Sequence, residues 1–428
     1  MGKTTSIIIY FNLLIFNISI SCIAQDMKAV EKNIKTLSAK NMRGRGYTFN
    51  GDKKAAAFIE QKFKDIGLQS YPKEEYLQHF EMPVNTFPNN ITLKINANSL
   101  KVGVDYLPST DSGTGNAEGE AYYISSDVFI KDAALVEFLK VDLSNKIVIY
   151  DQEEEKNRIT WNRALTTKIL QARASIVLFD KLTFSVARWQ VPQPRFYVLR
   201  EKLPADIEKI SFSIQPKFFK EYTSQNVISY IKGKTHPDKY LVFTAHYDHL
   251  GSIGKQIYFP GANDNASGIA LLLEIAKYYK SNTPDYSIVF IAFGAEEAGL
   301  IGSRYYVEHP FFPLDKIDFL INLDLFGSGE EGMMAVNGAV FTEQYQLLTS
   351  INTKNEFLPE IKKRGKAANS DHYYFSENGV PCFFFYLMGA SWPHYHDIKD
   401  NQPLPLSGFK GAYKLITTFG NELQTSSK

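Results

Sequence analysis

The sequence predicts an α/β protein, built on a mixed, mainly parallel sheet that is flanked by helices and carries an inserted α+β module. From residue 226 onward, short apolar runs alternate with segments of helical periodicity, the order of elements typical of a parallel sheet. The chain has 428 residues, which is long for a single hydrophobic core. Its 31 Phe and 25 Tyr provide ample material for a folded interior.

The domain organisation is predicted from changes of pattern along the chain. We expect residues 25–110 to form the N-terminal part of the main domain, residues 111–215 an insert, and residues 216–428 the rest of the main domain. Strand-like and helical pieces alternate within 115–215, but this block has no cluster of His, Cys or paired acids, so we expect no chemistry of its own there. The alternative is that the block continues one irregular domain.

Two further elements are expected before residue 110. A helix is predicted from Lys53, with Asp52 as its cap and Gly67 at its end. The Gly-rich segment 43–51 before it is either a simple connector or a loop that reaches the edge of the functional site. Alternating polar and apolar residues in 75–110 indicate strands of a second sheet.

Residues 1–24 have the pattern of a secretory signal peptide, with a short basic start, an apolar run and small residues before Gln25. Ordinary cleavage before Gln25 is the favoured interpretation, and lipoprotein anchoring through Cys22 is the alternative. Both predict an exported protein, periplasmic or extracellular. Cys382 is then the one remaining thiol, so no intramolecular disulfide is expected.

The charge distribution excludes several classes of partner. The net charge is +1 and the two signs are well mixed, so we expect neither nucleic-acid binding nor a polybasic membrane patch. The apolar run near the N-terminus is too short and too polar for a stable membrane span. The sequence leaves the oligomeric state open.

The candidate functional residues follow apolar strands or open a helix. Because the carboxyl ends of parallel strands meet at one edge of a sheet, we expect these side chains to converge. His246 and Asp248 follow the apolar run 241–244, and Glu296 and Glu297 follow the run 287–293. Asp324 follows the run 316–322, and His396 lies in the loop after the run 381–387. Asp264 precedes a helix whose apolar positions extend from Ile269 to Ala276.

Each of these residues has a plain structural interpretation when taken alone. A His-x-Asp pair occurs by chance in surface loops, adjacent glutamates usually form a solvated turn, and an Asp after a strand often caps a helix. The combination is more specific. Imidazoles mixed with carboxylates, and no nearby Cys, suit zinc or a similar divalent ion. One shared carboxylate with a pair of ligands on either side is what a two-metal site requires.

Six motifs in this order give the chain a family resemblance. HYDHLG, GANDNASG, AEEAGLIGS, INLDLFG, SDH and YHDIKD resemble the successive motifs of the bacterial co-catalytic di-zinc aminopeptidases, which are related to glutamate carboxypeptidases and glutaminyl cyclases. The dense part of the resemblance covers residues 226–420, and residues 43–68 resemble the N-terminal helical segment of that family. The block 115–215 resembles, more loosely, the protease-associated domain inserted in such enzymes. The resemblance implies the phosphorylase/hydrolase-like fold of zinc exopeptidases and two Zn²⁺ per chain.

The resemblance also implies a role for each candidate residue. Asp264 would bridge two zinc ions, of which one would be completed by His246 and Asp324 and the other by Glu297 and His396. Glu296 would be the general base, which takes a proton from a metal-bridging water and passes it to the leaving amine.

Three further residues would support the reaction. Asp248 would hold the imidazole of His246 in one tautomer, and Asp400 would orient His396. Tyr395 would donate a hydrogen bond to the tetrahedral intermediate. We also expect a tight turn at Gly261 and an anchoring role for Asn265.

The expected substrate is a peptide whose N-terminal residue is released, with a preference for apolar side chains. Aromatic residues beside the last ligand, in the segment 383–392, are candidates for an apolar pocket. No cluster of Arg or Lys stands near the motifs, which disfavours a carboxypeptidase for acidic residues. A glutaminyl cyclase-like or carboxypeptidase-like relative and an inactive binding protein are the alternatives.

Overall fold

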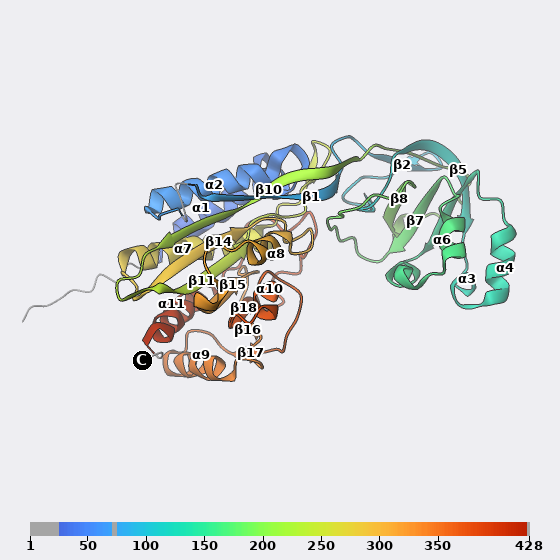
Figure 1. Cartoon of the computed structure of the whole chain (residues 1–428). Helices are drawn as coiled ribbons and strands as arrows, with labels where there is room; N and C mark the ends of the chain where they lie inside the picture. The colour runs from blue at the N-terminus through green and yellow to red at the C-terminus, as the bar shows by residue number, and fades with distance from the viewer. Residues whose placement is uncertain (1–24, 71–74, 426–428) are drawn as a thin grey trace, which may run out of the picture.

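An eight-stranded mixed sheet forms the centre of the larger of two lobes (Figure 1). The computed structural model describes residues 25–70 and 75–425, so the predicted signal peptide and Cys22 lie outside the described residues. In spatial order the strands of this sheet are β1 (Leu77–Thr86), β10 (Lys217–Ile231), β14 (Tyr286–Phe293), β11 (His236–His246), β15 (Ile317–Leu323), β18 (Cys382–Met388), β16 (Gly332–Val336) and β17 (Ile361–Lys363).

The four central strands β14, β11, β15 and β18 are parallel neighbours, so their carboxyl ends lie along one edge of the sheet. Every residue of β14 is buried, as expected for a strand covered on both faces. The predicted α/β fold with a mixed sheet is therefore confirmed.

Helices cover both faces of this sheet. One face carries the larger hydrophobic cluster and five helices: α1 (Met27–Leu37), α2 (Gly51–Ile66), α7 (Gly268–Ser281), α9 (Thr342–Asn355) and α11 (Phe409–Thr425). The other face carries α8 (Ile301–Glu308) and α10 (His372–Glu377).

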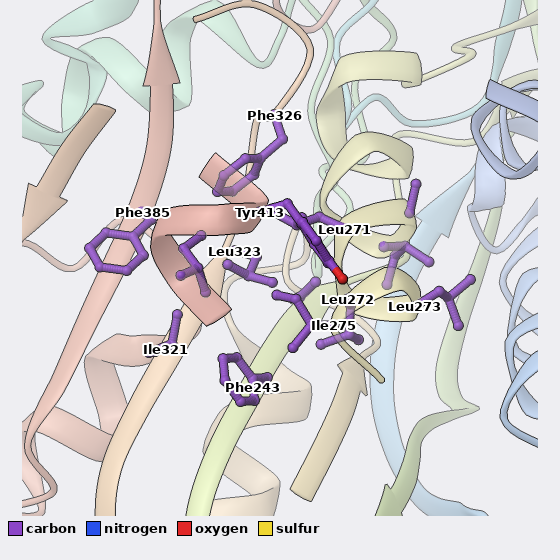
Figure 2. Packing of buried hydrophobic residues seen from close by; sticks show 14 of the residues in the cluster. Phe243, Leu271, Leu272, Leu273, Ile275, Ile321, Leu323, Phe326, Phe385 and Tyr413 are labelled. Carbon is purple, nitrogen blue, oxygen red and sulfur yellow. The ribbon is translucent and has the colours of Figure 1, made fainter. Parts of the chain in front are cut away.

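Helix α7 is the most deeply buried helix of this lobe. All residues from Gly268 to Ala276 are buried, because α7 lies between the sheet and the helices α1, α2 and α11. Figure 2 shows its side chains beside Phe243 of β11 and Tyr413 of α11. This packing fixes the N-terminus of α7, next to which the candidate site is built.

The second lobe is organised around another eight-stranded sheet, to which the long strands β1 and β10 lead (Figure 1). Its strands, in spatial order, are β3 (Asn98–Ser99), β2 (Thr92–Ile95), β9 (Ile210–Ile214), β5 (Gly115–Tyr123), β6 (Lys146–Asp151), β7 (Ala174–Phe179), β8 (Arg195–Leu199) and β4 (Tyr106–Pro108). Its helices are α3 (Asp127–Ile130), α4 (Asp132–Lys140), α5 (Gln152–Lys156) and α6 (Arg163–Ile169). The strands at 92–108 belong to the second sheet, as the alternation in 75–110 predicts, although they precede residue 111, where the insert was expected to begin. The prediction is wrong for β1 (Leu77–Thr86), which pairs with β10 in the main sheet.

The two lobes share a hydrophobic cluster. Leu250, Ile253 and Phe259 of the first lobe pack with residues of the second sheet, and the rings of Phe184 and Phe259 stack at 4.7 Å. Ile253 belongs to a small hairpin, β12 (Ser252–Ile253) with β13 (Ile257–Tyr258). The second lobe therefore packs beside the loops that follow β11.

The N-terminal helix differs from the prediction at its start. Helix α2 begins at Gly51, and Asp52 lies within its first turn, where it accepts hydrogen bonds from Tyr222 (2.7 Å) and Ser224 (3.0 Å). The prediction that Asp52 caps the helix is therefore wrong, because its carboxylate accepts hydrogen bonds from side chains of β10 instead. Gly67 ends the helix with a φ of 78°, as predicted. None of the helices in the described part of the chain is both long and apolar enough to cross a bilayer.

Candidate metal centre

The predicted metal ligands converge at the carboxyl edge of the parallel strands. His246 is the last residue of β11, Asp324 follows β15 directly, and Glu297 lies in the turn after β14. Asp264 comes from a short helical turn, η5 (Ala262–Ser267), and His396 from the loop after β18. The parallel order of the strands brings these residues, which are remote from one another in sequence, to one place.

Asp264 lies at the centre of two sets of side chains. Its Oδ1 is 3.4 Å from Nε2 of His246, and that nitrogen is 3.3 Å from Oδ1 of Asp324. Its Oδ2 is 3.2 Å from Nε2 of His396, which in turn is 3.3 Å from Oε2 of Glu297. The two oxygens of one carboxylate therefore face two different histidine–carboxylate pairs.

His249 is a further imidazole at this centre, and the sequence did not single it out. Its Nδ1 is 2.8 Å from Oε1 of Glu297, and its Nε2 is buried without a hydrogen-bond partner among the described residues. Donor atoms of His249, Asp264 and Glu297 lie within 4.8 Å of one another, as do those of His246, Asp264 and Asp324. The signal for His249 was its place in HYDHLG, directly after Asp248.

The electrostatics of the cluster require positive charge. Burial, followed by the nearby Glu297, Asp371 and Asp324, raises the pKa of Glu296 well above its ordinary value, while His246 opposes the shift. Burial alone would raise the pKa of Asp264 too, but its contacts with histidines hold that pKa well below the ordinary value. Buried carboxylates this close together ionise together only when cations offset their repulsion.

The donor set fits zinc. It consists of imidazole nitrogens and carboxylate oxygens with no thiolate, and Oδ1 of Asp324 is buried without a hydrogen-bond partner among the described residues. Zinc binds such N and O donors with tetrahedral geometry, and an uncompensated buried carboxylate oxygen is what a metal ion would satisfy.

Arg45 holds the loop that carries Asp264. Its guanidinium is fully buried and donates hydrogen bonds to five backbone carbonyls, which belong to Leu37, Tyr247, Pro260, Gly261 and Asp264, at 2.7–3.0 Å. Burial lowers the pKa of Arg45 to about 10, although the nearby carboxylates favour its charged form. The Gly-rich N-terminal segment thus reaches the site, which decides between the two interpretations of 43–51.

The turn at Gly261 is as tight as the sequence predicts. Gly261 has a φ of 59°, and a Cβ there would collide with the backbone oxygen of Asp264 and with His249. Asn265 anchors the loop as expected, because its Nδ2 donates to the carbonyl of Leu323 (2.9 Å) and its Oδ1 accepts from the amide of Gly268 (2.9 Å).

Asp400 contacts a different part of the site from the one expected. Its Oδ2 accepts from the amide of Asp264 (3.0 Å), and its Oδ1 accepts from the amide of Asn263 (2.9 Å) and from Trp392 Nε1 (2.8 Å). The proposed orientation of His396 by Asp400 is not what these contacts show. Asp400 instead fixes the loop of the shared carboxylate.

The carboxylate of Asp248 also accepts hydrogen bonds mainly from backbone amides. Its Oδ1 accepts from the amide of Glu296 (3.0 Å), and its Oδ2 accepts from the amide of Glu297 (3.3 Å) and the phenol of Tyr47 (3.0 Å). Nδ1 of His246 is 3.2 Å from the backbone oxygen of Asp248 and 3.8 Å from its carboxylate. The carbonyl is therefore the nearer partner of His246, and the carboxylate shapes the Glu296–Glu297 turn.

A cavity of about 270 Å³, here called the site cavity, opens onto these residues. Tyr395 lies at its rim, 54% exposed, with its ring stacked on His396 at 3.8 Å between centroids. Burial, followed by the nearby acidic groups, raises the pKa of Tyr395, so it stays a phenol and a hydrogen-bond donor. The lining residues are His246, Asp264, Glu296, Asp324, Leu325, Arg364, Asn369, Phe384, Tyr386, Tyr395 and His396.

Comparison with known proteins agrees with this geometry. Residues 226–409 match peptidase family M28. This part of the chain is therefore similar to the M28 peptidases. The M28 region contains every predicted metal ligand, and the predicted relation to zinc aminopeptidases is confirmed.

Two curated relatives illustrate the range of the M28 similarity. Aminopeptidase YwaD of Bacillus subtilis is 28% identical over 326 residues, which cover 73% of this chain and 69% of that protein. A probable zinc metalloprotease of Pyrenophora teres f. teres is 34% identical over 131 residues, 30% of this chain, but the match covers only 26% of that longer protein.

Solved structures share the fold of both lobes. BSAP, a zinc aminopeptidase from Bacillus subtilis, aligns with a TM-score of 0.68 and 22% identity over 92% of this chain and 94% of that one. An aminopeptidase from Aneurinibacillus sp. strain AM-1 aligns with a TM-score of 0.63 and 21% identity over 93% and 94%. The second lobe is therefore part of an architecture that these solved structures share.

Proposed function

We propose that this chain is an aminopeptidase that holds two zinc ions and removes the N-terminal residue of a peptide. The observation that carries the proposal is the placement of Asp264, whose two carboxylate oxygens face separate histidine–carboxylate pairs. Such an arrangement suits two cations that share one ligand. The match to M28 peptidases and the similarity to a Bacillus aminopeptidase support the same activity.

His246 and Asp324 would hold one zinc ion, Glu297 and His396 the other, and Asp264 both. Zinc in such a site lowers the pKa of water and polarises the scissile carbonyl. Side chains of the protein itself would transfer the proton, stabilise the oxyanion and bind the substrate.

Glu296 is placed to move the proton. It lines the site cavity next to the ligand Glu297, and its backbone is fixed by the hydrogen bond to Asp248 (3.0 Å). Its carboxylate would accept a proton from the attacking water and deliver it to the leaving amine. The Tyr395 phenol, at the rim of the same cavity, would donate a hydrogen bond to the developing oxyanion.

The same cavity accounts for selection of a free N-terminus. Glu296 and Asp324 line it together, and their carboxylates would accept hydrogen bonds from a protonated α-amino group. Of the aromatic residues in 383–392 that suggested an apolar pocket, Phe383 and Phe385 are wholly buried in the core, and Phe384 and Tyr386 line the cavity.

The test of the proposed function is hydrolysis of aminoacyl anilides by the purified protein before and after chelation. We expect turnover that is lost with the metal and restored by zinc, with two zinc ions per chain by elemental analysis. Activity that is unaffected by chelation would contradict the proposal. One zinc ion per chain with cyclisation of N-terminal glutamine would favour a glutaminyl cyclase.

The second lobe is proposed to shape access to the site, as a protease-associated-like insert would. Its segment after β7 reaches the metal-binding loop: the amide of Phe184 donates to the carbonyl of His396 (3.0 Å), and Lys181 donates to the carbonyl of Pro393 (3.2 Å). Phe184→Ala removes the ring that stacks on Phe259 at 4.7 Å and so loosens the packing between the lobes. Hydrolysis of peptides of increasing length should then depend differently on length than in the wild type, and an unchanged length dependence would contradict this role.

Export is proposed from the sequence of residues 1–24 alone. The mass and N-terminal sequence of the protein recovered from its native cell would separate the two processing routes. A start at Gln25 supports ordinary cleavage, a lipid-modified Cys22 supports anchoring, and an intact Met1 would refute both.

A further inference from the structure

One arginine lines the site cavity together with the candidate metal ligands. Arg364 follows the short strand β17 at the edge of the main sheet, and its backbone is tied on both sides: its amide donates to Ala335 O (3.0 Å), and its carbonyl accepts from the amide of Ala339 (3.1 Å). The guanidinium therefore extends from a fixed backbone toward the cavity.

The charge of Arg364 is not neutralised by the protein. Its side-chain partner is the phenol of Tyr386, at 3.3 Å from Nη1. Across residues 25–70 and 75–425, no carboxylate oxygen lies within 4.0 Å of its guanidinium nitrogens. A cation at the mouth of a cavity, without an acidic partner, is available to a ligand.

The neighbouring cations of the run 362–366 are engaged elsewhere. Lys362 pairs with Glu360 at 3.5 Å, and Lys366 pairs with Glu377 at 3.2 Å. Lys363 lies over the ring of Tyr345, 5.0 Å from its centroid. Arg364 is thus the member of this basic run that faces the cavity, and none of the three lysines lines it.

We infer that Arg364 determines substrate specificity by receiving the carboxylate of an acidic N-terminal residue, glutamate or aspartate. This inference rests on the proposed aminopeptidase function. The guanidinium is a planar fork of donors that matches a carboxylate, and the phenol of Tyr386 lies beside it at 3.3 Å.

The size of the cavity supports one residue as the occupant. Its volume of about 270 Å³ lies just below the roughly 300–1,000 Å³ that is usual for ligand sites. An amino group held by Glu296 and Asp324 places the side chain of that same residue in the remaining space, toward Arg364. Acidic specificity also departs from the apolar preference expected from the sequence. The expectation that no basic cluster stands near the motifs overlooked the run 362–366, which only three residues separate from the SDH motif at 370–372.

A peptide C-terminus is the other source of a carboxylate, and the experiment separates the two. We compare kcat/KM for the α-anilides of glutamate, glutamine and leucine, using zinc-loaded wild type, Arg364→Gln and the control Lys362→Gln. The dipeptides Leu-Ala and Leu-Ala amide form the second arm, since they differ only in the terminal carboxylate.

The wild type is expected to favour the glutamate over the glutamine anilide by about 10- to 100-fold, the value of a hydrogen bond to a charged group. Arg364→Gln should abolish this preference, mainly through KM, and leave the leucine anilide unchanged. Lys362→Gln should retain it. Because Arg364 is solvent-exposed, the preference should also fall as salt is raised.

Three results would overturn the inference. The first is equal turnover of the glutamate and glutamine anilides by the wild type. The second is an equal effect of Arg364→Gln on the hydrolysis of all three anilides. The third is that Arg364→Gln reduces hydrolysis of Leu-Ala more than hydrolysis of Leu-Ala amide. Absence of any turnover would instead count against the proposed function. In that case calorimetry of the zinc-loaded protein decides the inference: L-glutamate should bind more tightly than L-glutamine, and only when Arg364 is present.

Discussion

Nδ1 of His249 lies 2.8 Å from Oε1 of Glu297, and both side chains are buried beside Asp264. The imidazole can donate to one oxygen of Glu297 while the other oxygen faces His396 at 3.3 Å. A hydrogen bond of this kind fixes the direction in which a carboxylate presents its free oxygen to a metal.

The first prediction concerns this pair. His249→Gln should weaken zinc binding by roughly 10- to 100-fold, because partners of this kind typically contribute that much to metal affinity. Competition with a chromogenic chelator measures the effect. His309→Gln is the matched control, since His309 is exposed on the far end of α8. An unchanged zinc affinity in His249→Gln would show that Glu297 needs no such support.

Replacing the shared ligand should have a larger effect. Asp264→Ala removes the carboxylate that faces both histidine pairs, so elemental analysis should find little or no zinc in the purified variant. Asp318→Ala, on β15 but away from the cluster, should retain the metal of the wild type. If Asp264→Ala kept the full zinc content, the shared-ligand assignment would be refuted.

Glu296→Gln separates proton transfer from metal binding. The variant keeps a side chain of similar shape beside the ligand Glu297, so its zinc content should equal that of the wild type. Its kcat should fall by roughly 10²- to 10⁴-fold, which is the usual contribution of a general base. Glu308→Gln, a surface acid paired with Arg304, serves as the control. Wild-type turnover in Glu296→Gln would require another base.

Arg45→Met tests the support of the Asp264 loop. The substitution keeps an unbranched apolar stem but removes the donors to five buried carbonyls, and each unsatisfied buried group costs about 1–3 kcal/mol. We expect the free energy of unfolding in urea to fall by at least about 3 kcal/mol, with weaker zinc binding in the folded variant.

The control for this change is Arg43→Met, two residues earlier. Arg43 donates one hydrogen bond, to Lys255 O at 3.1 Å, and lies partly exposed over the ring of Phe49. Its replacement should cost less than about 1 kcal/mol. Equal destabilisation by the two variants would show that the carbonyl contacts of Arg45 are not what stabilises the loop.

The pH dependence of stability can be predicted for Asp52, which lies away from the metal cluster. Burial raises its pKa from 3.8 to about 6 in the folded protein, against the hydrogen bonds from Tyr222 and Ser224. Between these values the folded state keeps a proton that the unfolded state releases, so stability falls as pH rises from about 4 to about 6 and then levels off.

In Asp52→Asn this contribution is absent. The difference in free energy of unfolding between the variant and the wild type should therefore move by about 2 kcal/mol in favour of the variant between pH 4 and pH 7. Urea titrations at matched zinc concentration measure it, since the contributions of other groups cancel in the difference. A difference that does not change with pH would mean that Asp52 is not held in its protonated form.

Much of the site could be predicted from local patterns. The apolar runs that became β11, β14, β15 and β18 are recognisable from composition, and helix α7 from its periodicity. Parallel strands end at one edge of a sheet, so the residues that follow them had to meet. This geometry explains why His246, Asp264, Glu297, Asp324 and His396 are recognisable as a group from the amino-acid sequence.

The partners of these residues could not be predicted in the same way. Arg45 contacts the carbonyl of Asp264 from 219 positions away, and Asp400 accepts from the amide of Asp264 rather than orienting His396. Asp52 lies in the first turn of α2, where its carboxylate accepts hydrogen bonds from Tyr222 and Ser224 instead of capping the helix. Such contacts depend on how distant segments pack, and local periodicity contains no information about them.

The sequence by itself determined the fold class, the strand ends and the set of side chains able to bind a metal, because these follow from the order of apolar and polar residues along the chain. Only the tertiary structure decided that His249 faces Glu297, that the second lobe reaches the loop of His396, and that Arg364 lines the site cavity. The physical reason is that hydrogen bonds and cavities arise between segments remote in sequence, and folding alone brings them together.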